Sequence, residues 1–456
     1  METADSAGSS SQTYDRADAA TGSAAVAVRI FVVAWIYFGI AVAAGVLLRM
    51  QPVFPTPGID FGNVLHAHSH IAFLGWVFNA FFALAVRCFV PPENARWYWR
   101  LFLATQIAVI GILVTFPVQG YARESIVFST LHMVFAAVFV VSLLRRNRAE
   151  SVSRLYLFAA GVFLLGSSLG PLTLAPIMIA GLAGTMWYEL AVSYYLHFQY
   201  NGWFVFFLLA VVLQALRERG IHAIDVPARR AFPWLAAGCV LTFALSGLTL
   251  DPPLWVFIVA GAGGAAQISG CVLLVRGLRG AGQLFCSRNA RIARWLGGFA
   301  LGFFLLKVAL QAAASWPGLV GLAANHFTII AFMHLVFLGV VTPALIAFAS
   351  EMDWLPMRLA GRIGLAILAA GAVLSQVALA YSPLAAWIGW VAWPRFFETQ
   401  FAAAALMFMG VILIALDALR RTNANVQSSR IGVPDRHNVG RSARSGFRTS
   451  SRTDAP

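Results

Sequence analysis

Long apolar stretches recur along this chain, separated by short segments that carry most of the charge. A helix needs about 20 mostly apolar residues to cross the hydrocarbon core of a membrane. The pattern therefore predicts an all-α integral membrane protein with about twelve transmembrane helices. Their expected ranges, to within a few residues, are 28–48, 66–90, 97–117, 126–144, 154–178, 187–216, 231–250, 254–276, 294–315, 323–349, 360–380 and 400–418.

Polar segments flank this membrane domain on both sides. Residues 1–27 are low in complexity and rich in Ala, Ser and Asp, and residues 420–456 are rich in Arg, Ser, Thr and Asn. Such compositions bury too little apolar surface to form a core. We expect a disordered N-terminal tail, a single membrane domain over 28–419 and a disordered basic C-terminal tail. The first segment also lacks the basic region and short apolar run of a signal peptide.

The arginines predict how the helices are oriented, because basic residues are retained on the cytoplasmic side of a membrane. The loops after the second, fourth, sixth, eighth and tenth helices are rich in arginine, whereas the alternate loops hold only Arg49, Arg123 and Arg395. Both termini should therefore be cytoplasmic. The even-numbered helices should run from outside to inside across the plasma (inner) membrane.

The composition agrees with this class and narrows the choice of partners. Of 456 residues, 60% are hydrophobic and 11% are charged, against about 25% charged in soluble domains. The net charge of +14 comes from arginines in loops and in the C-terminal tail. Anionic membrane lipid is therefore the expected partner rather than nucleic acid. The four cysteines are scattered and indicate neither a disulfide framework nor a thiolate metal site.

Histidines mark three of the predicted helices. Residues 66–70 read His-Ala-His-Ser-His at the start of the second helix, and a His-x-x-x-x-Gly motif begins at His70. The motif returns at His197 in the sixth helix and at His334 in the tenth, each time with an aromatic residue three positions after the histidine. The regular interval predicts three repeated four-helix units. Chance recurrence of residues common in membrane helices is the alternative.

Seven histidines should lie in the outer half of the bilayer, at a rise of 1.5 Å per helical residue. They are His66, His68, His70, His132, His197, His326 and His334. A histidine exposed to lipid is costly, so each should face protein, water or a metal ion. We interpret at least one as a haem or metal ligand. The alternatives are wetted interfacial residues at the start of the second helix and a hydrogen-bonded helix contact around His197.

The position of residues on helix surfaces refines this interpretation. His66 and His70 are one turn apart and share a face, while His68 points to the other side. Lys307, which is the one lysine of the chain, and Gln311 are one turn apart in the ninth helix. This pair is equally compatible with a proton path and with a structural ion pair.

Twelve helices with histidines on the second, sixth and tenth resemble subunit I of the haem-copper oxidase and nitric oxide reductase superfamily. In that family a low-spin haem lies between a helix-2 histidine and the second histidine of a helix-10 His-x-His motif. The resemblance implies that His70 and His334 bind this haem and that His197 stands at a copper position. Three features depart from the family: Phe332 replaces the first helix-10 histidine, residues 231–250 contain no copper-binding histidines, and Tyr200 follows His197 by three residues rather than by the family's four.

The resulting hypothesis is a membrane haem protein with a non-covalent b-type haem and a role in electron transfer or in O2 and NO chemistry. His66 and His326 are further candidates for haem binding, and His197, His68 and His132 are candidate metal ligands, with copper as the metal that the resemblance implies. The sequence has no C-x-x-C-H attachment site. We expect quinol or a cytochrome as the electron donor, and small partner subunits.

Two other functions are compatible with the same pattern. In a cofactor-free transporter or membrane regulator, the histidines and Lys307 would line a proton or solute path. Transporter sites often use broken helices, and Gly170-Pro171 with Pro176 in the fifth helix is the one candidate for such a break, whereas histidines confined to the outer half favour haem. A metal-trafficking factor is a third candidate, although the chain lacks the Met- and Cys-rich tracts that suit copper(I).

Overall fold

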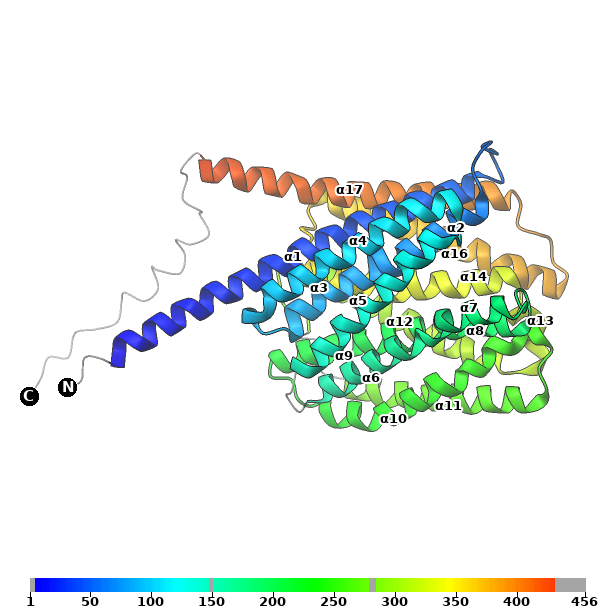
Figure 1. Ribbon diagram of the computed structural model, residues 1–456, viewed down its shortest axis with the longest axis horizontal. Helices are drawn as coiled ribbons and strands as arrows, with labels where there is room; N and C mark the ends of the chain where they lie inside the picture. Colours follow the sequence, from blue (N-terminus) through cyan, green and yellow to red (C-terminus); the bar gives the residue numbers. More distant parts are fainter. Residues whose placement is uncertain (1–4, 147–150, 279–283, 431–456) are drawn as a thin grey trace, which may run out of the picture.

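The computed structural model describes residues 5–146, 151–278 and 284–430, and within these ranges it contains helices and no strand (Figure 1). Twelve of its helical spans are long and apolar enough to cross a membrane, which confirms the predicted fold class. In chain order, spans 1 to 12 are Gly22–Met50, Phe61–Phe89, Pro92–Gln119, Arg123–Arg146, Val152–Ile179, Met186–Glu218, Asp225–Leu250, Leu254–Gly277, Ala290–Ala314, His326–Glu351, Leu359–Ile388 and Phe396–Arg420.

Several spans contain more than one helical element. The α-helices are α1 (Asp5–Met50), α2 (Phe61–His70), α3 (Phe78–Phe89), α4 (Ala95–Gln119), α5 (Arg123–Arg146), α6 (Val152–Ser167), α7 (Leu169–Ile179), α8 (Met186–His197), α9 (Val205–Glu218), α10 (Asp225–Leu241), α11 (Leu254–Gly277), α12 (Ala290–Ala314), α13 (Val320–Ala323), α14 (His326–His334), α15 (Thr342–Glu351), α16 (Leu359–Ile388) and α17 (Phe396–Arg430). The 3₁₀ segments are η2 (Pro92–Asn94), η4 (Thr242–Leu250) and η6 (Pro317–Leu319), and the π-helical segments are η1 (Ile71–Val77), η3 (Phe198–Phe204) and η7 (Leu335–Val341).

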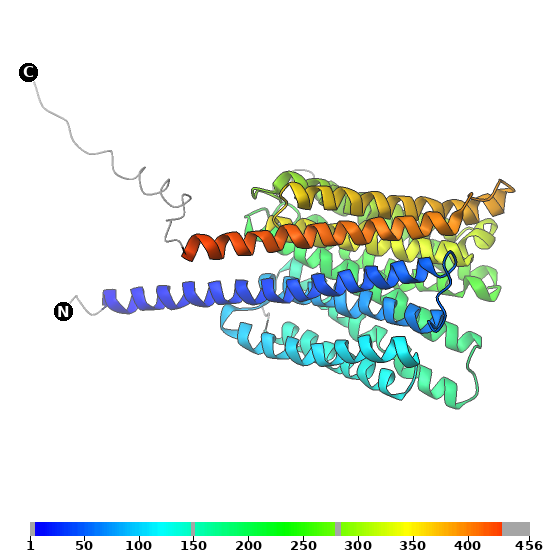
Figure 2. The same cartoon turned by 90° about the horizontal axis from the view of Figure 1, so that it is seen from above.

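The first and last helices extend beyond the membrane domain at the same end of the molecule (Figures 1 and 2). These helices include residues 5–27 and 420–430 of the predicted tails, and the disorder of the tails stays a prediction. Ala has the highest helix propensity, so the Ala-rich segment before span 1 readily continues the hydrogen bonding of that span. The remainder of both predicted tails lies outside the described residues.

Consecutive spans pack side by side around the bundle. Span 12 packs along span 1, and span 11 packs against span 10, so the two ends of the chain close the arrangement. Spans 2, 6 and 10 lie innermost. In their most apolar stretches 78%, 78% and 56% of the residues are buried, and no other span exceeds 44%. The three central helices are therefore the ones that carry the His-x-x-x-x-Gly motif.

Aromatic side chains join the three central spans. The rings of Phe73 and Phe337 are 4.7 Å apart, and Phe204 lies 5.6 Å from the first and 5.5 Å from the second. The Trp76 indole also donates a buried hydrogen bond of 3.1 Å to the Thr342 hydroxyl, linking span 2 to span 10. These contacts fix the relative rotation of the helices that bear the candidate histidines.

Each repeat of the motif adopts the same local structure. The π-helical segments η1, η3 and η7 begin directly after His70, His197 and His334. A π-helix holds an extra residue per turn and often occurs at functional sites. The sequence repeat is thus also a structural repeat, which agrees with three related four-helix units.

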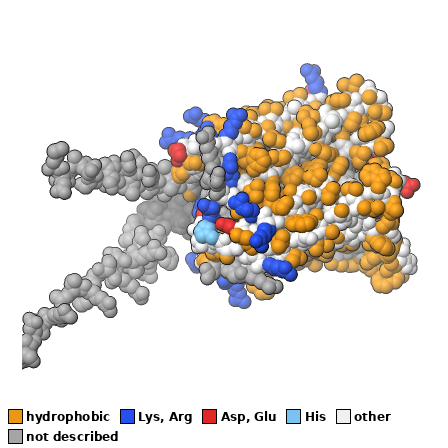
Figure 3. All heavy atoms as spheres, turned by 90° about the horizontal axis from the view of Figure 1, so that it is seen from below, with side chains coloured by type: hydrophobic (Ala, Val, Ile, Leu, Met, Phe, Trp, Pro, Cys, Tyr) orange, Lys and Arg blue, Asp and Glu red, His pale blue; other side chains and the backbone are white. Residues whose placement is uncertain are grey.

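The surface agrees with the predicted orientation. Lys and Arg side chains gather at the end from which the two termini project, and the adjoining flank is mainly hydrophobic (Figure 3). A wide apolar flank is expected where a protein contacts lipid. The arginine-rich end corresponds to the expected cytoplasmic side.

Candidate functional site

His68 lies on the side of span 2 that faces span 1. Its Nδ1 atom is 2.8 Å from the carbonyl oxygen of Ala41, and one turn further along span 1 a Cβ on Gly45 would lie 3.2 Å from the ring. A carbonyl oxygen can only accept a hydrogen bond, so Nδ1 carries the proton and Nε2 keeps its lone pair. His68 therefore has an Nε2 atom suited to binding a metal.

His334 on span 10 makes the same kind of hydrogen bond as His68. Its Nδ1 atom is 2.9 Å from the carbonyl oxygen of Ile330, which again leaves Nε2 unprotonated. The imidazole interacts electrostatically with His68 and with Arg49, which lies one turn beyond Gly45 on span 1. His68 and His334 thus share the same hydrogen-bonding pattern, and His334 is within electrostatic range of His68 and of one cation.

His70 points to the other side of span 2. Its Nδ1 atom is 2.8 Å from the carbonyl oxygen of His66, and its ring stacks on Phe116 of span 3 at 4.2 Å between centroids. It interacts electrostatically with His66 and with His132 of span 4. His68 and His70 therefore lie on opposite faces of span 2, and the pairing of His70 with His334 stays a prediction.

The remaining predicted ligands lie apart from this pair. His132 is buried on span 4, and its ring meets Phe78 edge-on at 4.8 Å. Its Nε2 atom has no hydrogen-bond partner among the described residues. His326 is exposed at the start of α14, where its ring contacts Phe327. Neither side chain contributes to the site formed by His68 and His334.

His197 belongs to a hydrogen-bonded chain that crosses three spans. Its Nε2–H donates to the Cys239 carbonyl oxygen at 2.8 Å, so Nδ1 accepts from the Asn201 amide at 3.1 Å. The Thr242 hydroxyl donates to the Gly238 carbonyl at 2.7 Å, with the Cys239 carbonyl further away at 3.3 Å, and accepts from the Gln267 amide at 3.1 Å. Both ring nitrogens of His197 are thus engaged by protein groups, as in the helix-contact alternative weighed from the sequence.

A lysine lies beside this chain. Lys307 is 2% exposed on span 9, interacts electrostatically with His197, and has no acidic side chain within ion-pair distance among the described residues. The buried side-chain oxygens of Asn201, Gln267 and Gln311 have no hydrogen-bond partner in that part of the chain. The cluster therefore offers an ammonium group and unpaired amide oxygens rather than the structural ion pair that the sequence allowed.

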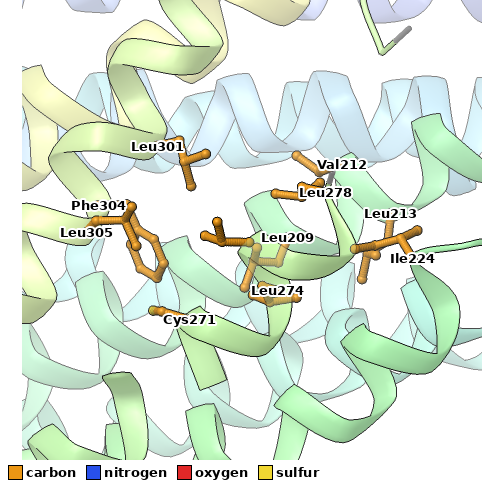
Figure 4. Close-up of a pocket in the computed structure, with 11 residues that line it drawn as sticks. Leu209, Val212, Leu213, Ile224, Cys271, Leu274, Leu278, Leu301, Phe304 and Leu305 are labelled. Carbon is orange, nitrogen blue, oxygen red and sulfur yellow. The ribbon is translucent and has the colours of Figure 1, made fainter. Parts of the chain in front are cut away.

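An apolar cavity of about 40 Å³ lies between spans 6, 8 and 9 (Figure 4). It is lined mainly by leucine side chains, with Phe304 and Cys271 at one edge. Such a cavity stays dry because it offers water no polar partner. None of the predicted site residues lines it.

The residues present do not fit the copper centre implied by the resemblance. Both ring nitrogens of His197 are hydrogen-bonded to protein groups. Phe332 stands where the family has the first histidine of its helix-10 motif, and span 7 contains no histidine. Within the described ranges, no group of three or more His, Cys, Asp or Glu side chains is arranged to hold a metal ion. The donor set fits a haem better, because two histidines each use Nδ1 on a backbone carbonyl and leave Nε2 open, as metal-bound histidines do.

Comparison with known proteins supports the architecture. Neither a family model nor a curated protein matches the chain. A solved structure of a heme-copper terminal oxidase dimer is similar, with a TM-score of 0.59, 10% sequence identity, and coverage of 87% of this chain and 84% of that chain. At this identity the similarity concerns the fold alone.

Proposed function

We propose that this protein is a membrane haem protein in which His68 and His334 bind one low-spin, non-covalent b-type haem. The observation that carries the proposal is geometric: these two histidines come from different central spans, and each uses Nδ1 on a backbone carbonyl and leaves Nε2 open. A bis-histidine haem would supply one-electron transfer. Quinol or a cytochrome is the electron donor that we propose, and O2 or NO chemistry would need a further partner or site.

The residues of span 1 support this assignment. Ala41, Gly45 and Arg49 recur at intervals of four and so lie on one face of the helix. Ala41 orients His68 through its carbonyl, and Gly45 keeps the space beside the ring free of a side chain. Arg49 would pair with a haem propionate, because a guanidinium binds a carboxylate strongly.

The test is the absorption spectrum of the detergent-purified protein, oxidised and then reduced with dithionite, with haem and metal analysis of the same sample. We expect a sharp reduced α-band that is lost in His68→Ala and in His334→Ala. His70→Ala and His326→Ala are the matched controls and should retain it. Loss of the band in His70→Ala with retention in His68→Ala would restore the pairing expected from the sequence.

A cofactor-free transporter is the second candidate, and one structural feature favours it. Span 5 is broken at Ser168, between α6 and α7, just before Gly170-Pro171. Together with the buried Lys307 cluster, such a break is compatible with a polar path through the membrane. A folded, colourless and metal-free protein would overturn the haem proposal and support this one.

A further inference from the structure

We propose that His66 and His70 form a separate site, near the outer end of span 2, that binds a divalent transition-metal cation such as Cu²⁺ or Zn²⁺. The site lies on the face of span 2 opposite to His68. It does not depend on the haem proposed above. Its ligands are two imidazoles of one helix, with the other coordination positions open to water or to an external ligand.

The two imidazoles share one environment. The ring of His66 lies 4.6 Å from Tyr121 and 6.4 Å from Phe116, and the ring of His70 lies 5.7 Å from Tyr121 and 4.2 Å from Phe116. Both side chains therefore converge on the same pair of aromatic rings at the end of span 3. They also interact electrostatically with each other.

The spacing suits chelation by one ion. The two histidines belong to the regular helix α2, before the π-helical segment begins, so their i and i+4 positions are one turn apart. Helical metalloprotease motifs bind zinc through two histidines with this spacing. Imidazole favours zinc, copper, nickel and iron among the common metals, and copper(II) binds most tightly in the divalent series.

The hydrogen bonds leave the required nitrogens open. His70 donates Nδ1–H to the backbone carbonyl of His66 at 2.8 Å, which fixes the ring and leaves the Nε2 lone pair available. No hydrogen bond to the ring of His66 is found among the described residues. Asp60, which caps α2, interacts electrostatically with His66 and favours a cation nearby.

Tyr121 completes the surroundings from the loop between spans 3 and 4. Its ring lies 4.6 Å from the ring of His66 and 5.7 Å from that of His70. A phenol can donate a hydrogen bond, so Tyr121 is suited to bond to a metal-bound water.

The test uses full-length protein in detergent, stripped with a chelator and titrated with Cu²⁺ and, separately, with Zn²⁺. We compare wild type with His66→Ala, His70→Ala and the double variant, and use His222→Ala, an exposed cytoplasmic histidine, as control. We expect one ion per wild-type chain, a loss of at least tenfold in affinity in each single variant, and no change in His222→Ala. The Cu²⁺ EPR spectrum should show coupling to two nitrogens that is lost in the double variant.

Two further measurements distinguish loss of metal binding from loss of the folded structure. Circular dichroism and thermal unfolding without metal establish that each variant is folded, and addition of Zn²⁺ should raise the unfolding temperature of wild type alone. Equal metal affinity in wild type and in the double variant would overturn the proposal. Loss of the haem band in His70→Ala would also overturn the proposal, because His70 would then be a haem ligand. Loss of that band in His68→Ala would not, because His68 does not belong to the metal site.

Discussion

The histidines of the membrane domain differ in which ring nitrogen the protein already uses. His68, His70 and His334 each bond Nδ1 to a backbone carbonyl and keep Nε2 open, whereas His197 uses both nitrogens. A neutral imidazole has one donor and one acceptor. The first three can still bind a metal through Nε2, while His197 would have to break a buried hydrogen bond to do so.

This distinction gives a prediction for His197→Ala. The variant leaves the Asn201 amide without its acceptor, at about 1–3 kcal/mol for a buried group left unpaired, and removes the shorter of the two side-chain hydrogen bonds to the Cys239 carbonyl. We expect a lower unfolding temperature with an unchanged ratio of haem to protein. His222→Ala should change neither. Loss of bound copper in the variant, from a wild type that contains copper, would contradict this account and identify His197 as a ligand.

The sequence predicts part of this site. Helical spacing already separates His66 and His70 from His68 on opposite faces of span 2. Which face meets span 10 depends on the rotation of the helix in the bundle, set by contacts such as the hydrogen bond from Trp76 to Thr342. The sequence contains no local signal for that rotation, so the proposed choice of His68 over His70 rests on the packed structure.

At the scale of elements, each motif glycine lies against an aromatic side chain of the preceding span. A Cβ would lie 2.9 Å from Tyr37 at Gly75, 2.5 Å from Phe163 at Gly202 and 2.6 Å from Phe303 at Gly339. Contacts this short force the aromatic ring or the helix to move. The glycine of the repeat therefore allows spans 1, 5 and 9 to approach the three π-helical segments.

Gly202→Ala and Gly339→Ala should accordingly destabilise the protein. Overpacking in a tight interior costs about 1–3 kcal/mol, which exceeds the gain of up to about 1 kcal/mol from replacing glycine by alanine in a helix. Gly302→Ala is the matched control, because it lies next to Phe303 on span 9 and a Cβ there meets nothing within 4 Å. We expect lower unfolding temperatures for the first two variants and no loss for the control. Equal stability of all three would show that the close approach is unimportant.

The sequence predicts the transmembrane spans better than the local structure within them. Hydropathy alone predicts all twelve spans, because each must be apolar over its full length. The extra residue per turn after His70 has no separate hydropathy signal, so the π-helical segments were not predicted. Span 2 begins at Phe61 rather than at residue 66, because Asp60 accepts a hydrogen bond from the Asn63 amide and caps the helix at a point where the sequence is still polar.

At the scale of the whole molecule, one carboxylate holds distant segments together at the arginine-rich end. Glu351, at the end of span 10, accepts a hydrogen bond of 2.6 Å from Arg219 beyond span 6. It also accepts from the backbone amides of Cys286 and Ser287, at 2.9 and 3.1 Å, in the loop between spans 8 and 9. Two central spans and this loop therefore meet at a side chain that is 9% exposed.

Glu351→Gln should loosen this end of the molecule. The substitution removes the negative charge that strengthens the hydrogen bonds from all three donors. The NH₂ group of glutamine would also face other donors. We therefore expect destabilisation of about 1–3 kcal/mol. Glu218→Gln is the matched control: its ion pair with Arg87 is long, at 3.9 Å, and about two-fifths exposed on both sides, and such surface pairs contribute about 0–1 kcal/mol. The unfolding temperature should fall for the first variant and hardly change for the second.

Proteolysis in the loop that contains Cys286 should also accelerate only in Glu351→Gln, because that loop loses its backbone hydrogen bonds to the carboxylate. Equal stability of the two variants, with an equally protected loop, would mean that apolar packing alone holds the cytoplasmic ends of these spans together.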